Sequence, residues 1–116
     1  MSKYKYRICH EEKYWFELLP NNSNSQPVAK SSLYNTYGEA LKGMENFRLY
    51  IAGNHNKAID TEDILIEGNR YQLCIYFDTS HNEFIKCRVC KRYELKECER
   101  IVRENYQVIH RLELDK

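Results

Sequence analysis

The motif Cys87-Arg88-Val89-Cys90 has the spacing most closely tied to a known chemistry, because zinc knuckles and redox dithiols both separate two cysteines by two residues. A tetrahedral zinc site needs four ligands around one point, and the sequence has no second close cysteine pair to complete it. Residues three apart on a strand also face opposite sides, so the two thiols are expected to diverge. We therefore predict no metal site, no redox dithiol and no cofactor.

Nucleophilic catalysis would need a thiol and an oriented base. Cys9 precedes His10, but the sequence does not establish that any base lies close to a thiol and is oriented toward it. The glycines are isolated, so the sequence has no glycine-rich phosphate loop. We predict that the protein is not an enzyme, and a small thiol-dependent enzyme is kept as an alternative.

A basic ridge is the candidate for nucleic-acid binding. Cations recur every three or four residues in a segment predicted to be helical, so they share one helix face: Arg92, Lys96, Arg100 and Arg103. Lys86, Arg88 and Lys91 extend the ridge. Glutamates are interleaved on the same helix, however, and alternating charges are typical of a solvated face with local ion pairs. Nucleic-acid binding through this ridge is therefore the second interpretation.

The composition is that of an ordinary globular protein, with 42% hydrophobic residues, 30% charged residues and a mean hydropathy of -0.76. A formal net charge of +1 gives no global attraction to nucleic acid or anionic lipid. No apolar run approaches the roughly 20 residues of a membrane span, and the charged N-terminus lacks the apolar stretch of a signal peptide. With five cysteines, an odd number, the sequence predicts a cytoplasmic protein with free thiols and no membrane partner.

The apolar residues nearly repeat after 57 residues, while the polar residues mostly differ at that offset. This pattern indicates two copies of one structural unit that share a core. The matched pairs are Ile8 with Leu65, Tyr14 with Tyr71, Phe16 with Leu73, Leu18 with Ile75, Val28 with Ile85, Leu41 with Cys98 and Met44 with Ile101. We predict a single domain made of two repeats, over about residues 1–53 and 58–116.

Each half alternates apolar and polar residues and then changes to a helical period. The alternation predicts strands over residues 4–8, 13–19, 28–34, 63–67, 71–77 and 83–90. Apolar spacings of three and four predict helices over residues 37–52 and about 93–107, the first with Thr36 and Glu39 at capping-box spacing and with Gly53 in a left-handed closing turn. Residues 20–27 predict an exposed loop, and residues 108–114 fit either helix or strand.

The stretch from Val28 to Arg48 resembles the YegP-like family of small bacterial proteins, built from two copies of a strand, strand, strand, helix unit. The likeness is carried by Ser31, Leu33, Tyr34, Thr36, Ala40, Gly43, Met44 and Phe47, all in register without a gap. It implies an α+β fold with a mostly antiparallel sheet, two helices packed on one face and an internal pseudo-twofold repeat. The family has no established activity, so the resemblance supplies no catalytic residue.

Two helices on one face of a sheet leave its other face open. Trp15 and Leu19 should lie on that open face, opposite Phe16, and Tyr76 should lie there opposite Ile75, with the two rows as neighbours. Amphipathic and apolar side chains on an exposed face tend to mark a contact site. We predict a non-enzymatic binding protein that contacts a protein partner, or a second copy of itself, through Trp15, Leu19 and Tyr76.

Overall fold

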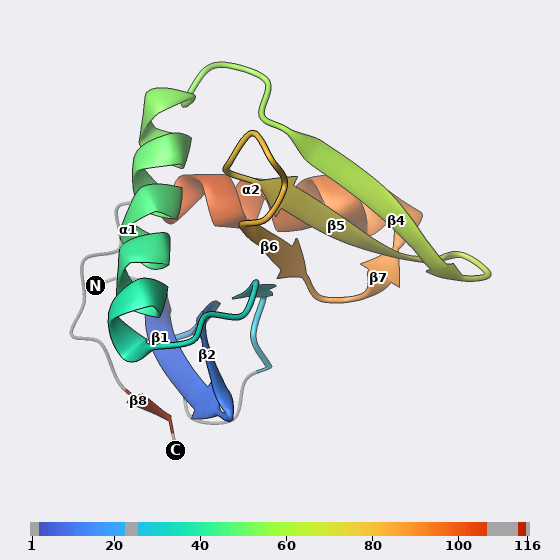
Figure 1. Ribbon diagram of the computed structural model, residues 1–116. Helices are drawn as coiled ribbons and strands as arrows, with labels where there is room; N and C mark the ends of the chain where they lie inside the picture. The colour runs from blue at the N-terminus through green and yellow to red at the C-terminus, as the bar shows by residue number, and fades with distance from the viewer. Residues whose placement is uncertain (1–2, 23–25, 107–113, 116) are drawn as a thin grey trace.

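In the computed structural model, which describes residues 3–22, 26–106 and 114–115, the chain folds into one mostly antiparallel sheet with two α-helices (Figure 1). The strand order is β4-β5-β6-β3-β2-β1-β8, and β7 pairs with β5 off this path. The strands are β1 (Tyr4–Glu11), β2 (Lys13–Pro20), β3 (Ala29–Ser31), β4 (Thr61–Glu67), β5 (Arg70–Tyr76), β6 (Phe84–Cys87), β7 (Cys90–Lys91) and β8 (Leu114–Asp115). The helices are α1 (Tyr37–Gly53) and α2 (Leu95–Glu104), and the 3₁₀ turn η1 (Arg92–Glu94) precedes α2.

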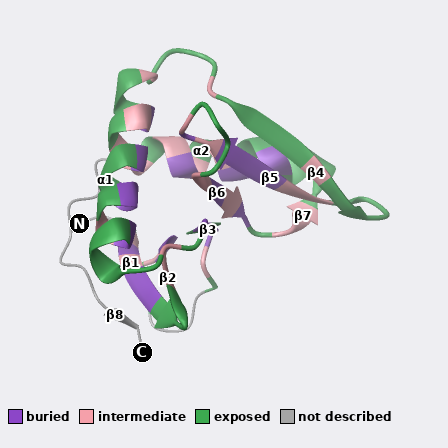
Figure 2. Ribbon diagram, viewed as in Figure 1, coloured by how far each residue is buried: buried purple, intermediate pink, exposed green. Residues whose placement is uncertain are grey.

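Both helices pack on one face of the sheet, and the core lies between them and that face. Helix α1 contacts β1 and β2, whereas α2 contacts β5. Figure 2 shows α1 buried along the side that faces the strands and exposed along the other. The core residues supplied by the strands are Tyr6, Ile8, Phe16, Leu18, Ala29, Leu73, Ile75, Ile85 and Cys87. This arrangement confirms the predicted α+β fold with two helices on one face.

Strands β3 and β6 form the centre of the sheet and join the two halves of the chain. Strands β1 and β2 lie on one side of this centre, and β5 and β4 lie on the other. The pairings along this path are antiparallel up to β1, and β8 then runs parallel to β1. The pseudo-twofold repeat and its boundaries near residues 53 and 58 stay predictions.

The predicted strand over residues 83–90 is wrong at its C-terminal end. Strand β6 ends at Cys87, and β7 begins at Cys90. Opposite β5, the register changes by one residue between the pair Cys74–Lys86 and the pair Arg70–Lys91. One extra residue therefore interrupts the alternation, as in a β-bulge, and a shift of one residue moves the following side chains to the other face.

Helix α1 begins as predicted and ends differently. Thr36 caps it, because its hydroxyl oxygen accepts a hydrogen bond from the Glu39 amide at 3.1 Å. The predicted left-handed turn at Gly53 is wrong: the C-cap is Asn54, with a φ of -121°, and its side-chain amide donates to the Tyr50 carbonyl at 2.8 Å. Neither of the α-helices in the described part of the chain is long and apolar enough to cross a membrane.

Two sequence predictions fall partly on residues that the structure does not describe. Residues 23–25 of the predicted loop are outside the described ranges, as are residues 107–113 of the segment that fits either helix or strand. Leu114–Asp115, at the end of that segment, forms strand β8.

Gly43 lets the Tyr34 side chain lie directly against α1. A methyl group at this position would lie 2.3 Å from the Tyr34 hydroxyl oxygen and 2.5 Å from the adjacent ring carbon. The Tyr34 hydroxyl also donates to Glu83 at 3.2 Å, so the ring is held from both sides. Close approach to this ring explains a glycine inside a helix, where it costs about 1 kcal/mol relative to alanine.

Replacing Gly43 with alanine is expected to lower the free energy of unfolding by about 1 kcal/mol, because displacing the ring costs more than the helix propensity regained. Urea denaturation measures this difference. Gly53→Ala is the matched control, since no atom lies within 4 Å of its added methyl group. The control should be stabilised, and a Gly43→Ala protein as stable as the control would show that Tyr34 moves freely.

Candidate functional site

The face of the sheet opposite the helices, called the outer face below, carries a continuous row of polar side chains. Cross-strand register places the row over six strands in the order Glu62, Cys74, Lys86, Lys30, Glu17 and Arg7. Their sequence neighbours, such as Leu73 and Leu18, belong to the core on the opposite face. The row therefore marks the side of the sheet that the two described helices do not cover.

Trp15 and Tyr76 both lie on the outer face, as predicted, and both are half-buried. The Trp15 indole nitrogen donates to Glu17 at 3.0 Å. The Tyr76 hydroxyl donates to Glu62 at 2.6 Å, and its ring stacks on His81 with centroids 3.9 Å apart. Each aromatic ring is thus held in a fixed orientation, while its role in binding stays a prediction.

Two features of the predicted surface are wrong. Leu19 is only 3% exposed, so its side chain offers no contact area in this structure. The rows of Trp15 and Tyr76 are not adjacent, because β3 and β6 lie between β2 and β5. The aromatic neighbour of Tyr76 is instead Phe84 on β6, with ring centroids 6.2 Å apart.

Glu17 is a buried carboxylate on the outer face, with 2% of its surface exposed. Arg7 approaches it to 2.5 Å, and Trp15 donates to its second oxygen, Oε2. Lys30 is more distant from the same carboxylate, at 3.9 Å. Arg7 and Trp15 together hold Glu17 in place, because a buried charge requires close partners.

A shallow hollow of about 360 Å³ opens over β3 and β6, at the middle of the outer face. Its charged lining residues are all cations: Lys30, Lys86 and Arg88. Gln26, Gln72 and Phe84 also line it. Lys86 and Arg88 form no ion pair with a described carboxylate. The hollow therefore has an excess of positive charge, although Lys30 also pairs with Glu17 at 3.9 Å and the Arg88 charge also acts on the thiols of Cys90 and Cys98.

Sequence reasoning missed this site because it grouped cations by their position along the chain. Spacing along the chain groups Lys86 and Arg88 with the ridge on the second helix, and it groups Lys30 with no other cation. The signal that could have found them is strand alternation, which places Lys30 and Lys86 opposite the core positions Ala29 and Ile85. Alternation could not show, however, that β3 and β6 are neighbours.

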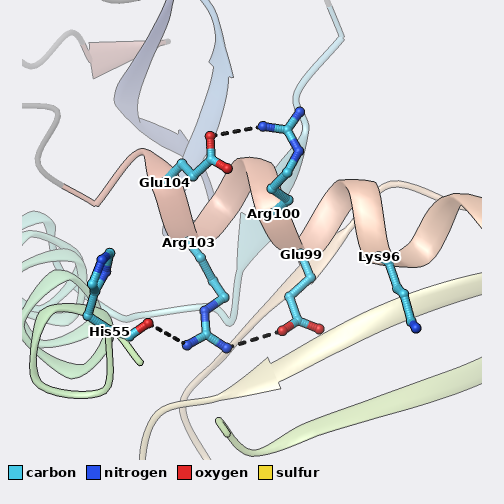
Figure 3. Close-up of a pocket in the computed structure, with 6 residues that line it drawn as sticks. All are labelled: His55, Lys96, Glu99, Arg100, Arg103 and Glu104. Atoms are coloured by element: carbon cyan, nitrogen blue, oxygen red, sulfur yellow. Dashed lines mark hydrogen bonds and ion pairs between the residues drawn. The ribbon is translucent and has the colours of Figure 1, made fainter. Parts of the chain in front are cut away.

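The predicted basic ridge borders a hollow of about 420 Å³ against the end of α1, shown in Figure 3. Its lining residues are His55, Lys96, Glu99, Arg100, Arg103 and Glu104. Unlike the hollow on the outer face, this one contains acidic side chains among the basic ones, and its guanidinium groups are engaged within the protein.

Arg103 has a structural role. It donates to the backbone carbonyls of Asn54, His55 and Lys57 at 2.9, 3.1 and 2.7 Å, and it pairs with Glu99 at 3.3 Å. These bonds hold the connection after α1 against α2, so the guanidinium is already engaged by groups within the protein. Removing it would leave carbonyl acceptors without their donor.

The other ridge residues differ in how far they are engaged. Arg100 forms ion pairs with Glu97 and Glu104. Arg92 lies over the Tyr71 ring, 5.8 Å from its centroid. Lys96, like Arg92, forms no ion pair with a described carboxylate, so these two of the four ridge cations add uncompensated charge to this part of the surface.

Three thiols meet on the inner face, contrary to the expectation that Cys87 and Cys90 diverge. The register shift before β7 turns Cys90 to the same side as Cys87, and its sulfur lies 4.0 Å from that of Cys98 on α2. Hydrogen bonds from Cys87 and Cys90 lower the pKa of the Cys98 thiol. In the described part of the chain, no group of three or more histidine, cysteine, aspartate or glutamate side chains is arranged to hold a metal ion.

Cys9 and His10, the adjacent thiol and base of the sequence, do not form an activated nucleophile. Cys9 is buried on the outer face, and burial raises the pKa of its thiol to about 12. His10 stacks on Tyr14, with ring centroids 4.0 Å apart. A thiol with so high a pKa is protonated at neutral pH and is a poor nucleophile.

The structure defines an α+β protein with an open, mostly antiparallel sheet whose helices lie on one face. It is similar to the solution NMR structure of YegP from E. coli, a protein of unknown function, with a TM-score of 0.75 over 98% of this chain and 94% of that chain. The sequence identity is 12%, so the likeness shows the fold alone: the chain has a YegP-like fold. No family model matches the sequence, and no curated protein matches it.

The thiol cluster predicts a low pH of ionisation for Cys98. The Cys98 thiol, which is buried, should lose its proton at a lower pH than an ordinary thiol, because its two donors stabilise the thiolate. Replacing Cys87 and Cys90 with alanine should move the half-maximal pH upward, as measured by the ultraviolet absorbance of the thiolate. Cys74→Ala on the outer face is the control. An unchanged half-maximal pH in the double variant would show that these thiols do not stabilise the thiolate.

Lys86→Gln is expected to raise the free energy of unfolding by a few tenths of a kcal/mol, because Lys86 lies directly opposite Lys30 and like charges at such positions destabilise a sheet. Thermal unfolding at low salt measures the change, and added salt should reduce it. Lys96→Gln on α2 removes the same charge away from this pair. Equal stabilities of the two variants would contradict repulsion between the lysines.

Proposed function

We propose that this chain is a non-enzymatic binding protein whose outer face contacts a macromolecular partner. Trp15, Phe84 and Tyr76 provide aromatic contact area, and the hollow of Lys30, Lys86 and Arg88 provides charge. The observation that supports this most directly is that these groups share the one face that the described helices leave uncovered. Aromatic residues and arginine are enriched at binding interfaces, whereas scattered surface residues need no such explanation.

The two other functions suggested by the sequence have weaker support. Binding of nucleic acid by the α2 ridge would require Arg100 and Arg103 to leave their ion pairs and carbonyl acceptors. A thiol-dependent enzyme would require a reactive thiol that a substrate can reach, whereas Cys9 is protonated at neutral pH and Cys98, whose pKa is lowered, is only 4% exposed. Neither requirement applies to the outer face, where Lys86 and Arg88 form no ion pair with a described carboxylate.

The test is capture from a cell lysate with the tagged chain, followed by assay of the bound fraction for both protein and nucleic acid. Trp15→Ser/Tyr76→Ser should retain the wild-type circular dichroism spectrum, since neither side chain belongs to the hydrophobic core, and should lose the captured partner. Leu49→Ser is the control, because Leu49 is 68% exposed on α1, away from the outer face. Equal capture by the double variant and the wild type would refute the outer face as the contact surface.

A further inference from the structure

We infer that the partner of the outer face is a single-stranded nucleic acid, with phosphates held at the hollow between Lys30, Lys86 and Arg88 and with bases stacked on the neighbouring aromatic rings. This inference rests on the proposed function, since it names the partner of that same surface. It concerns the sheet, and it assigns no part to the ridge on α2.

The first argument is the placement of charge. Lys30 and Lys86 are direct cross-strand partners at the centre of the sheet, where like charges repel. Arg88 adds a third cation, and no acidic side chain lines the hollow. Such a cluster destabilises the fold of the unbound protein. A polyanion relieves the repulsion, because its phosphates neutralise the positive charges.

The second argument is that the nearest carboxylate neutralises this cluster only in part. Glu17 lies between Arg7 and Lys30 in the row, but Arg7 is at 2.5 Å and Lys30 at 3.9 Å. The Trp15 indole occupies the other carboxylate oxygen of Glu17. Glu17 is thus bound mainly by Arg7 and Trp15. The Lys30 side chain is 58% exposed, so its ammonium can contact a phosphate.

The third argument is the combination of cations with half-buried aromatic rings on the same face. The Lys86 ammonium lies 5.2 Å from the centre of the Phe84 ring, and that of Lys30 lies 6.0 Å from the centre of the Trp15 ring. A base that stacks on either ring takes the place of the ammonium and leaves it free for the adjacent phosphate. Proteins that bind single strands combine these two elements, a cationic groove and stacking platforms.

A single strand fits this surface better than a duplex. The bases of a duplex are stacked on each other and cannot lie flat on a protein ring, whereas unpaired bases can. An acidic protein segment would satisfy the cations, but its carboxylates would make no use of the aromatic rings as stacking surfaces. The inference therefore requires a ligand that has both phosphates and flat, unpaired bases.

The experiment is a titration of a fluorescein-labelled single-stranded oligonucleotide, as DNA and as RNA, with the full chain, followed by anisotropy. Contact with three phosphates predicts a slope of log K against log salt of roughly -2, which means roughly 20-fold weaker binding at 200 mM than at 50 mM salt. The matching duplex should bind more weakly than the single strand. A slope near zero, or equal affinity for the duplex, would overturn the inference.

Variants assign the binding to the hollow. Lys30→Gln/Lys86→Gln should reduce the magnitude of the salt slope by roughly 1 to 2, and it should not unfold the chain, because it removes a repulsion. Phe84→Leu keeps apolar volume but loses the ring, and it should weaken binding roughly tenfold without changing the slope. Lys96→Gln/Arg100→Gln on α2 is the control and should bind as the wild type does. Loss of binding in this control alone would place the site on the ridge.

The outcomes also separate this inference from the proposed function. If the oligonucleotide does not bind, but Trp15→Ser/Tyr76→Ser still abolishes capture of a protein from lysate, the outer face is a contact surface for protein and the inference is wrong. If the chain forms a dimer and Lys30→Glu abolishes that dimer, the outer face binds a second copy of the chain, and the inference is again wrong. If capture is unaffected by the double variant, both proposals fail. Competition by polyglutamate as strong as by the oligonucleotide would refute base stacking.

Discussion

The pairing of β3 with β6 is the contact on which the rest of this structure depends. Strand β3 has three residues, yet it pairs with β2 on one side and with β6 on the other. Helix α1 packs on β1 and β2, and α2 packs on β5, and the β3–β6 pairing joins these two halves into one sheet over a shared core. The buried Ser31 hydroxyl ties β3 to β2, since it accepts from the Phe16 amide at 2.9 Å and donates to the Ser32 carbonyl at 2.8 Å.

The same register determines the chemistry of the other face. Because side chains alternate, pairing Ala29 with Cys87 and Ser31 with Ile85 in the core forces Lys30 opposite Lys86 outside it. A register that buries the apolar residues therefore cannot separate these two charges. Repulsion between exposed charges is worth a fraction of a kcal/mol, whereas burying the apolar neighbours is worth several. The core decides the register, and the positive hollow is its consequence.

Local patterns in the sequence predicted the elements well and their neighbours poorly. Helix α1 and its Thr36 cap were predictable because the signals lie within a few residues of each other. The shift before β7 was not, because a single extra residue leaves no mark in composition, and it reversed the prediction for Cys90. The engagement of the basic ridge was not predictable for a related reason: spacing identifies a shared helix face, but the acceptors of Arg103 on the connection after α1 come from distant sequence.

The residues that carry the YegP-like resemblance are largely explained by the fold itself. Ser31 supports the central strand, Thr36 caps α1, and Gly43 accommodates the Tyr34 ring. Ala40, Met44 and Phe47 are buried in the core, and only Leu33, 63% exposed, has no contact that explains it. A motif of this kind specifies a scaffold. The groups that give the outer face its charge, Lys30, Lys86 and Arg88, lie outside the motif, so the fold constrains where a binding face can form and leaves its chemistry free to differ between proteins that share it.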